Sequence, residues 1–238
     1  MTAARYFYST AAAVMLAITF IGFRPYYLGG EGMGGRQIAP ALFTLVLAHA
    51  VALTAWMVLF LVQSLLIDVR SRRVHMRVGW VGALVALGVT VSGCLLAVES
   101  VRLAPTVPFR GMPYRQFLLV MLAEMALFSG FVVAGVLARR RRERHRAMML
   151  LATLSILAGA TVRMPMLDPV FGEAGWLGIF GPVFALGAIL LLGRTALTRR
   201  LDRPLATGYA VLVVCYVAAC LLAVSTTWRD LAAAAFRT

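Results

Sequence analysis

Five ionisable side chains stand inside or directly beside long apolar stretches of this sequence, where they could do chemistry. They are His49, His75, Glu124, His145 and Arg163. A histidine can carry a proton near neutral pH, or bind a metal or haem iron. A carboxyl or guanidinium group in apolar surroundings is costly, so it usually has a polar partner and marks a functional site.

His49 and Glu124 are candidates for one buried polar pair. His49 lies about ten residues into its apolar segment and Glu124 about eight into its own, roughly 15 and 12 Å at the helical rise. We expect the two to meet in a hydrogen bond. Such a pair either relays protons or only fixes the register of two helices. Arg163 either joins the pair or extends to the lipid headgroups.

His75 and His145 each precede an apolar segment within an arginine-rich stretch. The sequences RRVHMRVGWVGALVALGVTVSG and RERHRAMMLLATLSILAGATVR form a weak repeat, which predicts two similar hairpins with both histidines at one depth. Such a pair could supply the axial ligands of a b-type haem. Alternatively, both histidines anchor helix ends among anionic headgroups. His49 lies at a different depth, although it could pair with Met121 or Met125 as haem ligands.

The composition of the 238-residue chain predicts a membrane protein. It is 62% hydrophobic and only 13% charged, which is more apolar surface than one water-soluble core can hide. Seven apolar segments approach the length that crosses about 30 Å of hydrocarbon. They run approximately over 6–23, 39–67, 79–99, 116–138, 147–163, 174–193 and 205–225. The sequence therefore predicts an all-α bundle of seven transmembrane helices in a single domain, 1–238, without a soluble catalytic domain.

Arginine supplies all 23 basic residues, against nine acids. Without lysine no Schiff base can form, which excludes a retinal pigment. The arginines fall in short runs between apolar segments, so they indicate topology rather than nucleic-acid binding. With the N-terminus in the cytoplasm, 15 arginines lie inside and eight outside. This distribution predicts a cytoplasmic N-terminus and a C-terminus on the opposite side of the membrane. The three cysteines lack metal-ligand spacing, so we expect no metal site among them.

Glycines mark two further features. The run GGEGMGG at 29–35 follows no strand and is expected to be a flexible outer loop. Gly175, Gly178 and Gly181 precede Pro182, which indicates close helix packing and a kink. Broken helices also occur in transporters, so small-molecule transport is one functional alternative.

The segments HAVALTAWMVLFLVQSLLI, RRVHMRVGWVG and RERHRAMMLLATLSILAGATVRMP resemble a widespread group of uncharacterised bacterial inner-membrane proteins. That group typically shows His-x6-Trp-x3-Phe-x2-Gln, His-Arg-Arg-Leu-Gly and His-Lys-Arg-Leu-Met-Leu-Leu-Ala-Thr motifs. The matching residues are His49, Trp56, Phe60, Gln63, His75, Gly79, His145, Met148, Leu151, Arg163 and Pro165. The departures are Met76, Val78, Glu124 and Ala147. The resemblance implies a multi-pass protein of the bacterial inner membrane, with a periplasmic C-terminus, but no reaction. The two hairpins are also distantly similar to cytochrome b561-like four-helix bundles, which implies haem b.

Three functions follow as expectations. The first is an accessory or structural subunit of a larger membrane complex, with other membrane subunits and anionic headgroups as partners. The second is electron or proton transfer linked to haem b or a quinone, with His75 and His145 as haem ligands or His49 and Glu124 as a proton relay. The third is transport.

Overall fold

The computed structural model describes residues 3–32 and 37–236, so positions 33–36 of the predicted glycine-rich loop lie outside the described residues. The chain is 83% helical, which confirms the all-α prediction. The longer helices are α1 (Ala3–Gly22), α3 (Pro40–Asp68), α4 (Arg72–Leu103), α5 (Tyr114–Leu137), α6 (Arg142–Ser155), α9 (Gly175–Thr198), α10 (Arg203–Ala223) and α11 (Thr226–Ala235). The shorter elements are α2 (Arg24–Gly29), β1 (Pro108–Phe109), β2 (Met112–Pro113), α7 (Ala158–Thr161), η2 (Pro165–Leu167) and α8 (Asp168–Phe171).

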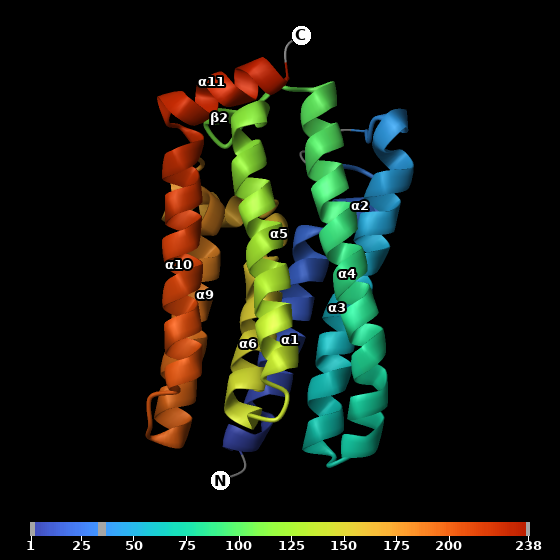
Figure 1. Cartoon of the computed structure of the whole chain (residues 1–238), viewed down its shortest axis with the longest axis vertical. Coiled ribbons are helices and arrows are strands. Elements are labelled where there is room, and N and C mark those ends of the chain that lie inside the picture. Colours follow the sequence, from blue (N-terminus) through green and yellow to red (C-terminus); the bar gives the residue numbers. More distant parts are fainter. Residues whose placement is uncertain (1–2, 33–36, 237–238) are drawn as a thin grey trace.

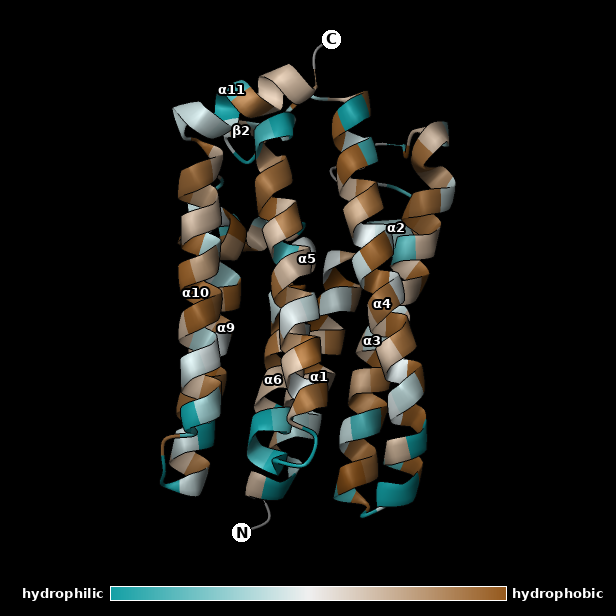
Figure 2. Ribbon diagram, viewed as in Figure 1, coloured by the Kyte–Doolittle hydropathy of each residue, from teal (hydrophilic) through white to brown (hydrophobic). Residues whose placement is uncertain are grey.

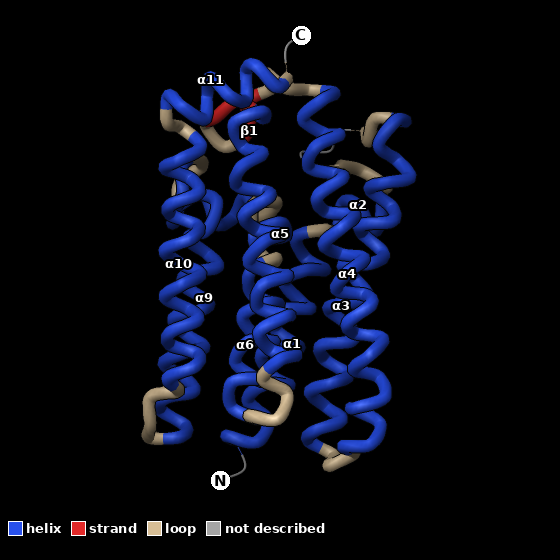
Figure 3. Tube along the Cα trace, viewed as in Figure 1, coloured by secondary structure: helices blue, strands red, loops and turns tan. Residues whose placement is uncertain are grey.

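Six of the described helices are long and apolar enough to cross a membrane: α1, α3, α4, α5, α9 and α10. A seventh span results if α6 and α7 are counted together with the η2–α8 segment, which is bent from them by 98°. The structure therefore supports a multi-pass membrane protein with six or seven crossings. Figure 3 shows that nearly the whole trace is helix, with a short strand pair at the end of the bundle where α11 lies.

The predicted straight fifth segment, 147–163, differs from the structure because the helix breaks after Ser155. The Tyr216 hydroxyl on α10 donates to the Ser155 carbonyl at 2.6 Å, and Leu157 N turns back to Leu154 O. A side chain inserted into the helical hydrogen-bond ladder is a common cause of such a break. Pro165 has no backbone N–H to continue the helix. The chain therefore bends where the sequence predicts the end of a span.

Two helices also begin earlier in the chain than predicted. The segment predicted at 79–99 is part of α4, which begins at Arg72, and α6 begins at Arg142 rather than 147. Both helices extend through their arginine-rich first turns because these residues are acceptable helix formers outside the apolar core. His75 and His145 therefore lie on the first turns of helices, not in the loops before them.

The long helices run side by side, and the two chain ends lie at opposite ends of the bundle (Figure 1). The turns α3–α4, α5–α6 and α9–α10 all lie at the end where α1 begins, which we call the arginine-rich end. Figure 2 shows hydrophilic residues gathered there and apolar residues along the helices. At the opposite end, α11 lies across the ends of α5 and α10 (Figure 1), where Trp228 Nε1 donates to Gln116 O at 3.0 Å.

The broken segment formed by α6 and α7 packs against α1, α5, α9 and α10. Its side chains are among the most buried in the structure, including Leu150, Leu151, Leu154 and Leu157. A cavity lies beside this segment and is lined by Ile156, Ala158 and Gly159, at and just after the break. That space is where the candidate site lies.

Candidate functional site

A cavity of about 280 Å³ brings together three of the residues predicted from the sequence. His49 comes from α3, Glu124 from α5, and Arg163 from the chain just after α7. Most of the remaining lining is aromatic or aliphatic. Its aromatic members are Phe23, Tyr26, Tyr27, Phe109, Tyr114, Phe117 and Phe180. Glu31 and Ser100 also line it. The cavity therefore combines a few polar groups from separate segments with largely apolar walls, which is the usual make-up of a small-molecule site.

The helix face that carries His49 points into the bundle. Trp56 and Phe60 on the same face of α3 are buried. The Trp56 ring packs edge-on against Phe128 of α5, with 5.0 Å between ring centroids. This packing fixes the rotation of α3 against α5, and with it the direction of His49.

Hydrogen bonds determine which nitrogen of His49 carries the proton. Its Nδ1 lies 3.0 Å from Ser92 Oγ, and Ser92 donates its own hydrogen to the Gly88 carbonyl at 2.6 Å. Ser92 can therefore only accept from His49, so Nδ1 is the protonated nitrogen. In the neutral ring Nε2 is left as a hydrogen-bond acceptor.

Gly93 on α4 makes room for the imidazole. A Cβ atom at this position would overlap Met125 Sδ and lie 3.1 Å from His49 Cε1. Met121 and Met125 line the same cavity. The absence of a side chain at Gly93 thus lets His49 and Met125 pack beside one another against α4.

Arg163 lies in the bend that follows α7. Its guanidinium lies over the Phe23 ring, 4.5 Å from the centroid, and donates to the Gly159 carbonyl. Within the described ranges the structure holds three ion pairs, and neither Glu124 nor Arg163 belongs to them. Arg163 thus lines the cavity, where its guanidinium contacts Phe23 and Gly159. The predicted direct bond between His49 and Glu124 is not among the hydrogen bonds of the described residues, and the two share the cavity instead.

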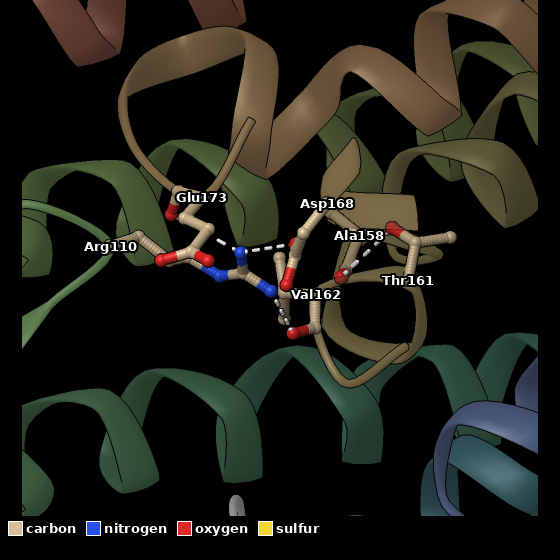
Figure 4. Close-up of polar contacts among 6 residues, drawn as sticks. All are labelled: Arg110, Ala158, Thr161, Val162, Asp168 and Glu173. Atoms are coloured by element: carbon tan, nitrogen blue, oxygen red, sulfur yellow. Dashed lines mark hydrogen bonds and ion pairs between the residues drawn. The ribbon is translucent and has the colours of Figure 1, made fainter. Parts of the chain in front are cut away.

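Arg110 ties the bend that carries Arg163 to the β1–β2 turn (Figure 4). It donates to Asp168 Oδ1 at 2.6 Å and to Glu173 O at 3.2 Å, and also to the carbonyl of Val162. Arg110 and Gly111 have positive φ angles of 46° and 88°, which a two-residue turn between antiparallel strands requires. Sequence reasoning missed this contact, because Arg-Gly is not among the dipeptides that mark a tight hairpin turn.

The structure brings His75 and His145 together at the arginine-rich end. Their ring centroids are 6.2 Å apart and their planes are nearly perpendicular, at 89°. His75 Nδ1 lies 3.3 Å from Gln63 O on α3, and His145 Nδ1 lies 2.8 Å from Gly135 O on α5. A carbonyl oxygen only accepts, so both Nδ1 atoms donate and both Nε2 atoms are free to bind. Each histidine thus contacts the helix before its own, as the weak repeat predicts.

The distance between the two ring centroids equals the one that two axial ligands of a single metal ion would have. Two nitrogen–metal bonds of about 2.0–2.1 Å on opposite sides of one metal ion would place the ring centres roughly 6 Å apart. A second hydrogen bond from Nδ1 to a carbonyl is also the usual way in which a ligating histidine is oriented.

His145 has a simpler structural role as well. Arg139 N bonds to Val136 O rather than to Gly135 O, so His145 supplies a donor to a carbonyl at the end of α5.

No family model, curated protein or solved structure matches the chain. The chemistry of the site therefore has to be argued from its own residues. Of these, the sequence identifies His49, Glu124 and Arg163, while Ser92 and Gly93 become visible only through the packing of α4 on α3. The aromatic lining likewise comes from segments that are separated along the chain.

Proposed function

We propose that the chain is an accessory subunit of a larger complex in the bacterial inner membrane and that it contributes a binding cavity for a quinol. The observation that carries this proposal is the convergence of His49, Glu124 and Arg163 on one aromatic cavity. The orientation that we propose has the arginine-rich end in the cytoplasm, because 15 of the 23 arginines belong to that end. The cavity then lies in the periplasmic half of the protein.

The size and lining of the cavity favour a single substituted ring. An apolar cavity of about 150 Å³ is large enough for benzene, so about 280 Å³ accommodates a ring with several substituents. Aromatic side chains such as Phe23, Tyr114 and Phe180 provide faces for stacking. A ligand that reaches this site from the bilayer must itself be lipid-soluble. A quinol headgroup meets these requirements and also offers two oxygen atoms for the polar residues.

The polar residues suit the reduced form of the ligand. The unprotonated Nε2 of His49 can accept a hydrogen bond from one quinol hydroxyl. The guanidinium of Arg163 can donate to the second oxygen, whose hydrogen can be accepted by the Glu124 carboxylate. When a quinol is oxidised it releases two protons and two electrons. In the proposed role, His49 and Glu124 take the protons and another subunit of the complex takes the electrons.

Equilibrium binding of a short-chain quinol to the purified protein in lipid nanodiscs tests this proposal. We expect Glu124→Ala to weaken binding about tenfold, because the variant loses the oxygen atoms that accept the hydroxyl hydrogen of the quinol. The matched control is Glu99→Ala, since Glu99 is an exposed acid on α4 that pairs with Arg102. The control should bind like the wild type. Absence of saturable binding, or equal affinities for both variants, would refute a quinol site at this cavity.

A second candidate function, electron transfer through a haem, rests on the geometry of His75 and His145. If haem b binds here, the two Nε2 atoms hold its iron, and the cofactor supplies one-electron transfer. The test is a reduced-minus-oxidised visible spectrum of protein expressed with an ample haem supply. We expect a haem spectrum that is lost in His75→Ala and retained in His49→Ala. A colourless wild-type protein, or a spectrum that survives His75→Ala, would remove this candidate.

A further inference from the structure

A second cavity, of about 610 Å³, forms a groove between α5 and α10 and has the first turn of α6 at one end. It shares no lining residue with the cavity that holds His49 and Glu124. Its residues are Ala126, Leu127, Gly130, Phe131, Ala134, Ala138, Arg144, Met148, Arg203, Pro204, Thr207, Gly208 and Val211. Apart from two arginines and one threonine, all of them are apolar.

The groove runs along the helices. On α5 its floor includes Ala126, Gly130, Ala134 and Ala138, which recur every four residues and so lie on one face. Twelve residues of helix correspond to roughly 18 Å, which is comparable to the length of an acyl chain. A Cβ added at Gly130 would meet no other atom within 4 Å. The groove is therefore open at Gly130, near the middle of this face of α5.

Two cationic side chains stand at the arginine-rich end of the groove. Arg144 belongs to α6 and Arg203 to α10, and both side chains are exposed. Neither belongs to an ion pair in the part of the chain that the structure describes. The neighbouring acid, Asp202, has other partners. Its Oδ2 lies 3.6 Å from Arg194 Nε, and its Oδ1 accepts a hydrogen bond from Leu205 N. The positive charge at the mouth of the groove is thus left for a ligand.

We propose that this groove binds one anionic phospholipid. Its phosphate lies between Arg144 and Arg203, and one acyl chain follows the small residues of α5 toward Ala126. The combination of a narrow apolar channel and two guanidinium groups at one end matches a molecule with a long hydrocarbon tail and an anionic head. A zwitterionic lipid offers the same tail but no net negative charge, so the charge at the mouth favours the anionic lipid. This site is independent of the proposed quinol cavity.

Native mass spectrometry of the detergent-solubilised protein, titrated with phosphatidylglycerol, tests the proposal. We expect Arg144→Gln combined with Arg203→Gln to weaken binding of the first lipid about thirtyfold, the effect of two arginines at a membrane surface. Phosphatidylcholine with the same acyl chains should bind more weakly than phosphatidylglycerol to the wild type. The double variant should lose this difference.

Two controls locate the lipid. Arg140→Gln combined with Arg200→Gln removes the same charge from the same end without touching the groove, and should bind phosphatidylglycerol like the wild type. Gly130→Leu fills the channel at a position with free space, and should weaken binding of both lipids. Equal losses in the two double variants would show attraction by the surface in general and overturn the proposal. Full binding in Gly130→Leu, or competition by inorganic phosphate as strong as by the lipid, would also overturn it.

Discussion

All three histidines have their Nδ1 atoms committed to oxygen atoms of neighbouring residues. Ser92 Oγ holds that of His49, and the carbonyls of Gln63 and Gly135 hold those of His75 and His145. In each neutral ring Nε2 is consequently the open nitrogen. The sequence identifies these histidines by type and position. It does not predict the open nitrogen, because the acceptors lie on other helices or far along the chain.

Gly93 permits a side-by-side arrangement of His49 and Met125, so we predict that Gly93→Ala destabilises the protein. The added methyl group must displace Met125 Sδ and the imidazole, and overpacking of this kind costs about 1–3 kcal/mol. The free energy of unfolding in detergent should fall by an amount in this range. Gly82→Ala on the same helix is the control, because its added Cβ meets nothing within 4 Å. A control that loses as much stability as Gly93→Ala would contradict the packing described here.

At the scale of elements, the broken segment of α6 and α7 has the largest consequence. The apolar run predicts a span over 147–163, but the helix ends at Ser155 because the Tyr216 hydroxyl takes its carbonyl. Tyr216 lies 61 residues further along the chain, so no local pattern could indicate the break. Arg163 lies in the second irregularity of this segment, the 98° bend after α7, which faces the cavity. The sequence thus predicts the helix and the arginine, whereas the geometry that joins Arg163 to His49 and Glu124 depends on tertiary contacts.

Arg110 should keep this bend in place. Its ion pair with Asp168 is largely buried, with side chains 9% and 23% exposed, so we predict that Arg110→Ala loosens residues 158–173. Amide hydrogen exchange in this segment should become faster, by a local free energy of about 1–3 kcal/mol. The matched control is Arg102→Ala, whose pair with Glu99 is 62% and 41% exposed and contributes little. Unchanged exchange at 158–173 in Arg110→Ala would show that the bend holds without this contact.

The bundle as a whole agrees with the composition of the chain. Its helices, their apolar character and the clustering of arginines at one end follow from hydropathy and charge. The number of crossings does not follow, because the bent segment has the composition of a span without its straight geometry. The hairpins that carry His75 and His145 bring the two rings to 6.2 Å, in agreement with the depth predicted from the repeat. The groove between α5 and α10 has no counterpart in the sequence analysis, because its small residues are common throughout the chain.

We predict that the two ends of the chain lie on opposite sides of the membrane. They lie at opposite ends of the bundle (Figure 1), and arginine retention should keep the N-terminal end in the cytoplasm. Fusions of a green fluorescent protein and of alkaline phosphatase to each terminus report the side on which that terminus lies. Fluorescence at the N-terminus and phosphatase activity at the C-terminus are expected. The same reporter active at both ends would contradict the orientation.

The most direct test of the proposed site compares the affinity of the cavity for a quinol with its affinity for the corresponding quinone. Because Nε2 of His49 accepts a hydrogen bond, it matches a quinol hydroxyl and opposes a quinone carbonyl. We therefore expect the wild-type protein in nanodiscs to bind the quinol at least about tenfold more tightly. His49→Phe should remove that preference, while His75→Phe, at the arginine-rich end, should retain it. Equal affinities for quinol and quinone in the wild type, or a preference that survives His49→Phe, would contradict the proposed role of the cavity.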